Sequence, residues 1–127
     1  MTPDARRERT ERAGRAGEFV AEIFLRLKDY RILARRFRNH GGEIDLIALA
    51  PGFGGNATLA AIEVKRRAHM DMAAIALNAR QRKRIVQAAR GFLASRPQFD
   101  GASLRFDLIL VAPGRLPRHL ISAWQEE

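Results

Sequence analysis

The sequence contains no cysteine, which excludes a disulfide framework, a zinc site built on thiolates and a cysteine nucleophile. Its apolar runs are far shorter than the roughly 18 residues that a membrane span needs, so we predict no transmembrane segment and no membrane partner. The first dozen residues are charged and have no apolar region of the kind found in signal peptides, so we expect no secretory signal. A chain without cysteine suits a reducing compartment, and we expect a cytoplasmic protein.

Acidic residues are scarce compared with basic ones: 14 Asp and Glu stand against 23 Lys and Arg, for a formal net charge of +9. A surplus of this size favours polyanion partners, with nucleic acid first and an anionic membrane surface second. A second explanation stays open, because lysine occurs only as Lys28, Lys65 and Lys83 and genomic base composition can produce such a skew toward arginine. The charge therefore indicates a class of partner and no chemistry.

The chain length of 127 residues is enough for one domain, and the 46% hydrophobic content suits a folded protein. Residues 1–11 have the composition of a basic, flexible N-terminal arm, which fits a solvated tail and a phosphate-contacting arm equally well. Residues 12–127 are predicted to form a single domain.

Helical spacing of apolar residues predicts an amphipathic helix over residues 12–28. Glu18 falls near the edge of its apolar arc, beside Ala21 and Leu25, so it could face a cleft instead of bulk solvent. The stripe expected to be apolar and buried consists of Ala16, Phe19, Val20, Ile23, Phe24 and Leu27, and the opposite polar arc consists of Arg12, Arg15, Glu22 and Arg26.

The remaining pattern predicts a single α/β domain with a mixed central sheet flanked by helices, in the order α-β-β-β-α-β. The first three strands are expected to form a meander in which the second and third are antiparallel. The expected elements are strands at 30–38, 43–49 and 58–66, a short helix at 71–76, a longer helix at 80–94, a buried strand at 104–111 and a short final element at 116–124.

The residues that can support chemistry lie between Gly42 and Lys65. The two-residue period of a strand places Glu63 and Lys65 on one face, and a hairpin can bring Asp45 of the neighbouring strand beside Glu63. Two carboxylates a few ångströms apart repel each other unless a cation lies between them. Oxygen ligands of this kind suit Mg²⁺ or Mn²⁺, which also accept ligands from a phosphate.

This arrangement is typical of phosphodiester hydrolysis. Lys65 could position the attacking water or stabilise charge on the phosphate, and Glu18 could complete the shell of the metal. Glu63 and Lys65 alone also fit a solvated strand face, and for Glu43 we favour an ion pair with an arginine across the hairpin over direct metal binding.

Four motifs together resemble the YraN-like family of small bacterial proteins: Gly14-x-x-Gly17-Glu18-x-x-Ala21, Gly42-Glu43-Ile44-Asp45-Leu46-Ile47, Glu63-Val64-Lys65 and Arg105-Phe106-Asp107. That family is similar to the restriction-endonuclease-like (PD-(D/E)XK) superfamily and, in layout, to the archaeal Holliday-junction resolvases. The resemblance implies that Glu18, Asp45, Glu63 and Lys65 are the metal-binding and catalytic set. It also implies a divalent metal, usually Mg²⁺.

The chain departs from the family pattern at Gln81, where many relatives have lysine. Gln81 could orient a metal-bound carboxylate, but we favour a polar residue of the first helical turn. The Arg105 and Asp107 pair matches the family and fits a buried ion pair equally well.

The sequence thus predicts a metal-dependent endonuclease that acts on DNA, with branched or otherwise structured DNA among its candidate substrates, and a two-fold homodimer would suit a resolvase. A non-catalytic nucleic-acid-binding module stays open as the alternative, followed by an assembly protein with an acidic partner. The expected phosphate contacts are Arg12, Arg15, Arg80, Lys83, Arg84 and Arg90, with contributions from Arg35, Arg36 and Arg38.

Overall fold

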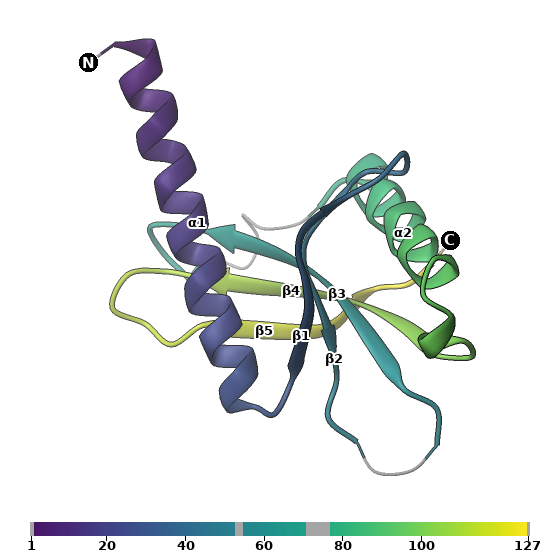
Figure 1. The fold of residues 1–127 in the computed structure, drawn as a ribbon. Coiled ribbons are helices and arrows are strands. Elements are labelled where there is room, and N and C mark those ends of the chain that lie inside the picture. Colours follow the sequence, from purple (N-terminus) through teal and green to yellow (C-terminus); the bar gives the residue numbers. More distant parts are fainter. Residues whose placement is uncertain (1, 53–54, 71–76, 127) are drawn as a thin grey trace.

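One five-stranded sheet runs through the computed structural model, which describes residues 2–52, 55–70 and 77–126 (Figure 1). The strands lie in the order β1-β2-β3-β4-β5; β3 and β4 are parallel and the other neighbours are antiparallel. The elements are α1 (Pro3–Leu27), β1 (Arg31–Arg38), β2 (Glu43–Leu49), β3 (Thr58–Arg66), α2 (Ala79–Ala94), the 3-10 turn η2 (Pro97–Phe99), β4 (Ser103–Val111) and β5 (Arg118–Trp124). The predicted single α/β domain with a mixed sheet is confirmed, while the short helix expected at 71–76 lies outside the described residues.

The two helices cover opposite faces of the sheet (Figure 1). On one face, α2 buries Ile85, Val86 and Phe92 against β2, β3 and β4, while on the other face α1 buries Ala21 and Leu25. A parallel pair of strands needs a crossover connection, and α2 lies within the one that joins β3 to β4. None of the described helices has an apolar stretch of the length required to cross a bilayer.

Helix α1 contacts the sheet with a different face from the one that the sequence predicts. Phe19 and Leu27 of the expected buried stripe are 64% and 80% exposed, and Val20 and Ile23 are also exposed. The prediction is wrong because small residues at a four-residue spacing allow the helix to approach the sheet closely, and the buried positions are Gly17, Ala21 and Leu25.

Glu22 also differs from the prediction: expected on the exposed polar arc, it is only 9% exposed and lies against β1. Arg35 donates to both of its carboxylate oxygens, at 2.5 and 2.9 Å, and Arg26 adds a third hydrogen bond at 3.1 Å. These hydrogen bonds, above all the one from Arg35, hold the pKa of Glu22 below its usual value. A buried carboxylate is tolerated here because it is paired on two sides.

Helix α1 begins at Pro3, so the predicted boundary between an arm at 1–11 and a domain at 12–127 falls inside the helix. Thr2 caps it by accepting a hydrogen bond from the Ala5 N–H at 3.1 Å, and proline suits the first helical position because its missing N–H would have no partner there. The N-terminal part of α1 projects past the sheet (Figure 1).

The turn between β1 and β2 packs directly on α2 and thereby fixes the start of β2. Asn39 accepts hydrogen bonds from the Gly41 and Gly42 N–H groups and donates to the Ala88 carbonyl of α2 at 3.0 Å. A Cβ on Gly41 would lie 2.7 Å from the Ala88 backbone nitrogen, so only glycine fits between the turn and the helix.

Replacing Gly41 with alanine is therefore expected to destabilise the protein by about 1–3 kcal/mol, because the α2 backbone must move. Thermal unfolding would show this as a lowered midpoint. Gly14→Ala is the matched control: a Cβ there meets no atom within 4 Å, and alanine favours a helix interior, so the midpoint should stay or rise. Equal midpoints for the two variants would contradict the close contact at Gly41.

Arg105 and Asp107 form the buried ion pair that the sequence left as one of two possibilities. Asp107 is 0% exposed and accepts from Arg105 at 2.7 Å, from His119 at 2.8 Å and from the Ser122 N–H at 3.0 Å. Arg105 also donates to the Tyr30 hydroxyl at 2.6 Å. This network joins β4 to β5 and to the connection between α1 and β1, and its role is structural.

Candidate active site

The candidate site lies where β2 and β3 run side by side. The paired part of the two strands ends at Leu46 and Ile62, and Asp45 and Glu63 are the next residues beyond that pair. The Asp45 carboxylate accepts a hydrogen bond from the Val64 N–H at 2.8 Å, which fixes it across the strand pair. The predicted hairpin neighbours are thus brought together.

Asp45 experiences an unusual electrostatic environment for a carboxylate. Burial raises its pKa to about 7, and the negative charge of Glu63 acts in the same direction, followed by that of Glu18. The hydrogen bond from the Val64 N–H acts in the opposite direction and is too weak to offset them. A pair of carboxylates in this state gains strongly from a cation between them.

Lys65 lies on the same face of β3 as Glu63, as the strand period predicts. Its ammonium nitrogen is 3.0 Å from Glu63 Oε1, and both side chains are about four-fifths buried, at 20% and 18% exposure. Because little water reaches this ammonium, its attraction to a carboxylate or to a bound phosphate is screened less than at the protein surface.

A cavity of about 200 Å³ opens on the carboxylate pair from the α2 side. A cavity of this size has room for several waters, which suits a hydrated ion and a phosphate oxygen. Its lining consists of Glu43, Asp45, Glu63, Gln81, Arg84 and Ile85.

Glu43 and Gln81 line this cavity but are engaged in local structure. Glu43 pairs with Arg38, its direct neighbour across the hairpin, and this confirms the favoured interpretation of Glu43. Gln81 accepts a hydrogen bond from the Asn78 N–H at 3.1 Å and donates its own N–H to the Asn78 side chain at 2.8 Å, which forms the capping box of α2. Gln81 is therefore a first-turn residue, as favoured, that also borders the site.

Glu18 approaches the site from α1, on the opposite face of the sheet from α2. Its carboxylate is 20% exposed and accepts a hydrogen bond from Arg36 Nε of β1 at 2.7 Å. Sequence reasoning counted Arg36 only among the β1 arginines that could touch phosphate, and missed it as the partner of Glu18. No sequence signal marks it, because an arginine in a strand gives no indication of such a contact.

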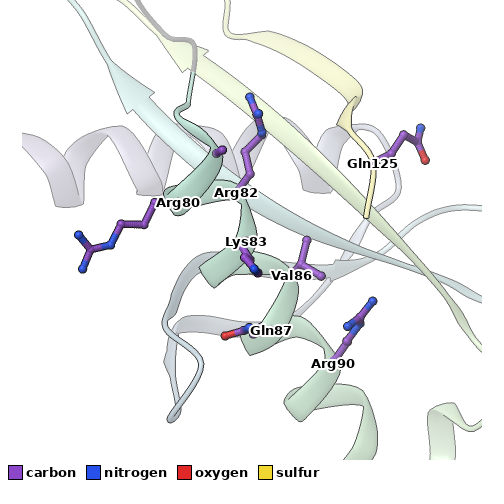
Figure 2. A pocket seen from close by; sticks show the side chains of 8 residues that line it. Arg80, Arg82, Lys83, Val86, Gln87, Arg90 and Gln125 are labelled. Atoms are coloured by element: carbon purple, nitrogen blue, oxygen red, sulfur yellow. The ribbon is translucent and has the colours of Figure 1, made fainter. Parts of the chain in front are cut away.

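The six cations expected to contact phosphate fall on two sides of the molecule: Arg12 and Arg15 on α1, and Arg80, Lys83, Arg84 and Arg90 on α2. A second cavity, of about 450 Å³, lies between α2 and Gln125 (Figure 2). Its basic lining residues are Arg80, Arg82, Lys83 and Arg90. Arg90 pairs with Glu126 at 2.5 Å, so one of these cations already has an acidic partner.

The donor set determines what the site can bind. Within the described ranges, no group of three or more histidines and carboxylates lies close enough to hold a metal ion together. Asp45 and Glu63 alone supply two carboxylates, which fits Mg²⁺ or Mn²⁺, because such ions keep several waters and take oxygens from a substrate phosphate. Glu18 lies close enough to influence the pKa of Asp45 while its own carboxylate is held by Arg36.

Comparison with known proteins assigns the chain to a family. The model of the uncharacterised protein family UPF0102 matches residues 17–111. The chain belongs to the UPF0102 family. It is 49% identical over 125 residues to a UPF0102 protein of Methylorubrum extorquens, covering 98% of this chain and 94% of that relative. It is 49% identical over 113 residues to one from Rhodopseudomonas palustris (89% and 83% covered) and 45% identical over 126 residues to one from Methylobacterium nodulans (98% and 94% covered).

The UPF0102 match confirms the resemblance inferred from the motifs and includes all four candidate catalytic residues, Glu18, Asp45, Glu63 and Lys65. Arg12 and Arg15 lie before the matched residues. The names of these relatives state no activity, so the function has to be argued from the site.

Proposed function

We propose that this UPF0102 protein is a Mg²⁺- or Mn²⁺-dependent endonuclease that hydrolyses phosphodiester bonds in DNA. The observation that supports this most strongly is the juxtaposition of Asp45, Glu63 and Lys65 on two paired strands. Two adjacent carboxylates, of which Asp45 has a raised pKa, and the largely buried ammonium of Lys65 beside them suit a cation and a phosphate together.

Asp45 and Glu63 would hold the metal, which when bound lowers the pKa of water and offsets charge on the phosphate. The Val64 N–H keeps the Asp45 carboxylate oriented across the strands, and Lys65 keeps Glu63 from turning away. The ammonium of Lys65 also orients the attacking water by hydrogen bonding and opposes negative charge on the phosphate oxygens. Glu18 supports the pair from the α1 side.

The positive charge of the protein supports DNA as the substrate. All three of the basic residues Arg80, Lys83 and Arg84 lie along α2, where successive phosphates could follow the helix: Arg84 lines the carboxylate cavity, and Arg80 and Lys83 line the basic cavity. We take branched or structured DNA as the preferred form and the cytoplasm as the location, and a homodimer would place two such sites on one junction.

A non-catalytic DNA-binding module is the second candidate. The ion pair between Glu18 and Arg36 favours this candidate, because it occupies the Glu18 carboxylate. Among the described residues, the site then has two carboxylates for a metal and not three. Such a module would bind DNA with the same basic residues and would cut nothing.

A cleavage assay on the purified protein separates the two candidates. Linear duplex, single strand, flap and four-way junction DNA would each be incubated with Mg²⁺, Mn²⁺ or EDTA, and the products resolved on a denaturing gel. Cutting that requires the metal, with one substrate preferred, is the expected result. Binding of every substrate without cutting under any of these conditions would favour the binding module.

A further inference from the structure

A third cavity, of about 300 Å³, lies between α1 and β1 beside the candidate active site. Arginines from both elements line it, Arg15 from α1 and Arg35 and Arg36 from β1, and Glu18 forms part of its wall. Glu18, in the wall of this cavity, is near enough to act electrostatically on Asp45, although neither Asp45 nor Glu63 lines the cavity itself. The roles assigned above to the α2 cations do not involve it.

The two β1 arginines of the cavity are held very differently. Arg35 binds both oxygens of the buried Glu22, which also accepts from Arg26, so this contact is part of the fold. Arg36 makes one hydrogen bond to Glu18, from Nε, and its side chain is 47% exposed. A single, partly exposed ion pair contributes little to stability, so Arg36 can exchange its partner at small cost.

Arg36 also has a backbone conformation that strands rarely contain. Its φ is +49°, in the left-handed region that is unfavourable for an arginine. The β1–β2 register pairs Arg35 with Leu46 and Phe37 with Ile44, which places Arg36 directly opposite Asp45. Backbone strain of this kind persists only where surrounding structure imposes it, and such positions cluster at functional sites.

We infer that the cavity between α1 and β1 binds a backbone phosphate of the DNA next to the one that is cleaved, and that Arg36 exchanges Glu18 for this phosphate. The inference rests on the proposed function. Arg36 offers a planar fork of donors that matches a phosphate better than the single contact it makes with Glu18. The exchange releases the Glu18 carboxylate beside Asp45, so that occupation of this cavity completes the acidic site.

A double-mutant cycle on Glu18 and Arg36 tests the exchange without any cleavage. The affinity of a fluorescent DNA duplex would be measured by anisotropy in EDTA, for the full chain and for Glu18→Gln, Arg36→Asn and the double variant. Asparagine tolerates a positive φ, so Arg36→Asn removes the cation and keeps the turn of the strand. Glu18→Gln is expected to tighten binding about fivefold and to increase the salt slope by about one phosphate contact, because it releases Arg36.

In the Arg36→Asn background, the same Glu18→Gln change should alter affinity by less than about twofold. An equal gain in both backgrounds would mean that removal of a negative charge acts at long range, and would overturn the exchange; no gain in either would also overturn it. Arg31→Asn, on the same strand about 17 Å away, is the matched charge control, and there the fivefold gain from Glu18→Gln should persist. Failure of every form to bind DNA would overturn the proposed function together with this inference.

Discussion

Replacing Asp45 with asparagine is expected to reduce metal-dependent DNA cleavage by about 1,000-fold while leaving DNA binding in place. Asparagine has nearly the same shape and can still accept the hydrogen bond that Asp45 receives from the Val64 N–H at 2.8 Å. The substitution removes only the charge, and with it one of the two carboxylates that would hold the metal. The measurement is the single-turnover cleavage rate with saturating enzyme, beside the affinity for the same DNA.

Asp100→Asn is the control for this experiment, because Asp100 is an exposed residue next to η2, away from the three cavities that adjoin α1, the carboxylate pair and α2. It makes the same chemical change and should leave the cleavage rate within about twofold of the unmodified protein. Cleavage that survives Asp45→Asn would show that the hydrolytic centre lies elsewhere. Loss of both cleavage and binding would mean that Asp45 acts through the fold or through DNA contact.

The same substitution is expected to change how the stability of the folded protein depends on pH. The pKa of Asp45 is about 7 in the folded protein, above its ordinary value of 3.8, so the folded state retains a proton that the unfolded state releases. Stability is therefore unaffected by Asp45 below about pH 4, decreases as the pH rises toward 7, and stays reduced above it. Asp45→Asn removes this cost, which is at most about 4 kcal/mol, and should raise the unfolding midpoint at pH 8 in EDTA but hardly at pH 4.

Sequence patterns were sufficient to predict the β2–β3 part of the site. Strand periodicity fixed the common face of Glu63 and Lys65, and the loop between the two strands fixed their antiparallel direction. Such a hairpin can bring Asp45 beside Glu63, and in the structure these two are the first residues beyond the last β2–β3 pair, Leu46 with Ile62. These are local properties of the chain, and local properties can be inferred without knowing what packs against them.

The orientation of α1 could not be predicted in the same way. The helix has two faces at helical spacing, one with large apolar residues such as Phe19 and Leu27, and one with Gly17 and Ala21. Hydrophobicity alone selects the first, but close approach to the sheet and the pairing of Glu22 with Arg35 select the second. The residues that determine which face of α1 packs on the sheet are on another element, so the sequence of the helix alone does not predict its orientation.

Replacing Lys65 with methionine is expected to lower the cleavage rate at saturating DNA by about 100-fold, with DNA affinity changed less than about threefold. Methionine keeps much of the length of the side chain and removes the ammonium that lies 3.0 Å from Glu63. Without the ammonium, the positive charge that offsets the negative charge of the phosphate and of the carboxylate pair is lost. The measurement separates the rate at saturation from the DNA concentration that gives half of it.

Lys83→Met is the matched comparison, because Lys83 is an exposed lysine of α2 that lines the basic cavity. It should show the opposite division: weaker binding, a salt slope reduced by about one contact, and a rate at saturation close to that of the unmodified protein. If the two lysines gave the same division, Lys65 would be a binding residue and not part of the hydrolytic centre. A rate lost at Lys65 and an affinity lost at Lys83 would assign chemistry to the β2–β3 pair and DNA contact to α2.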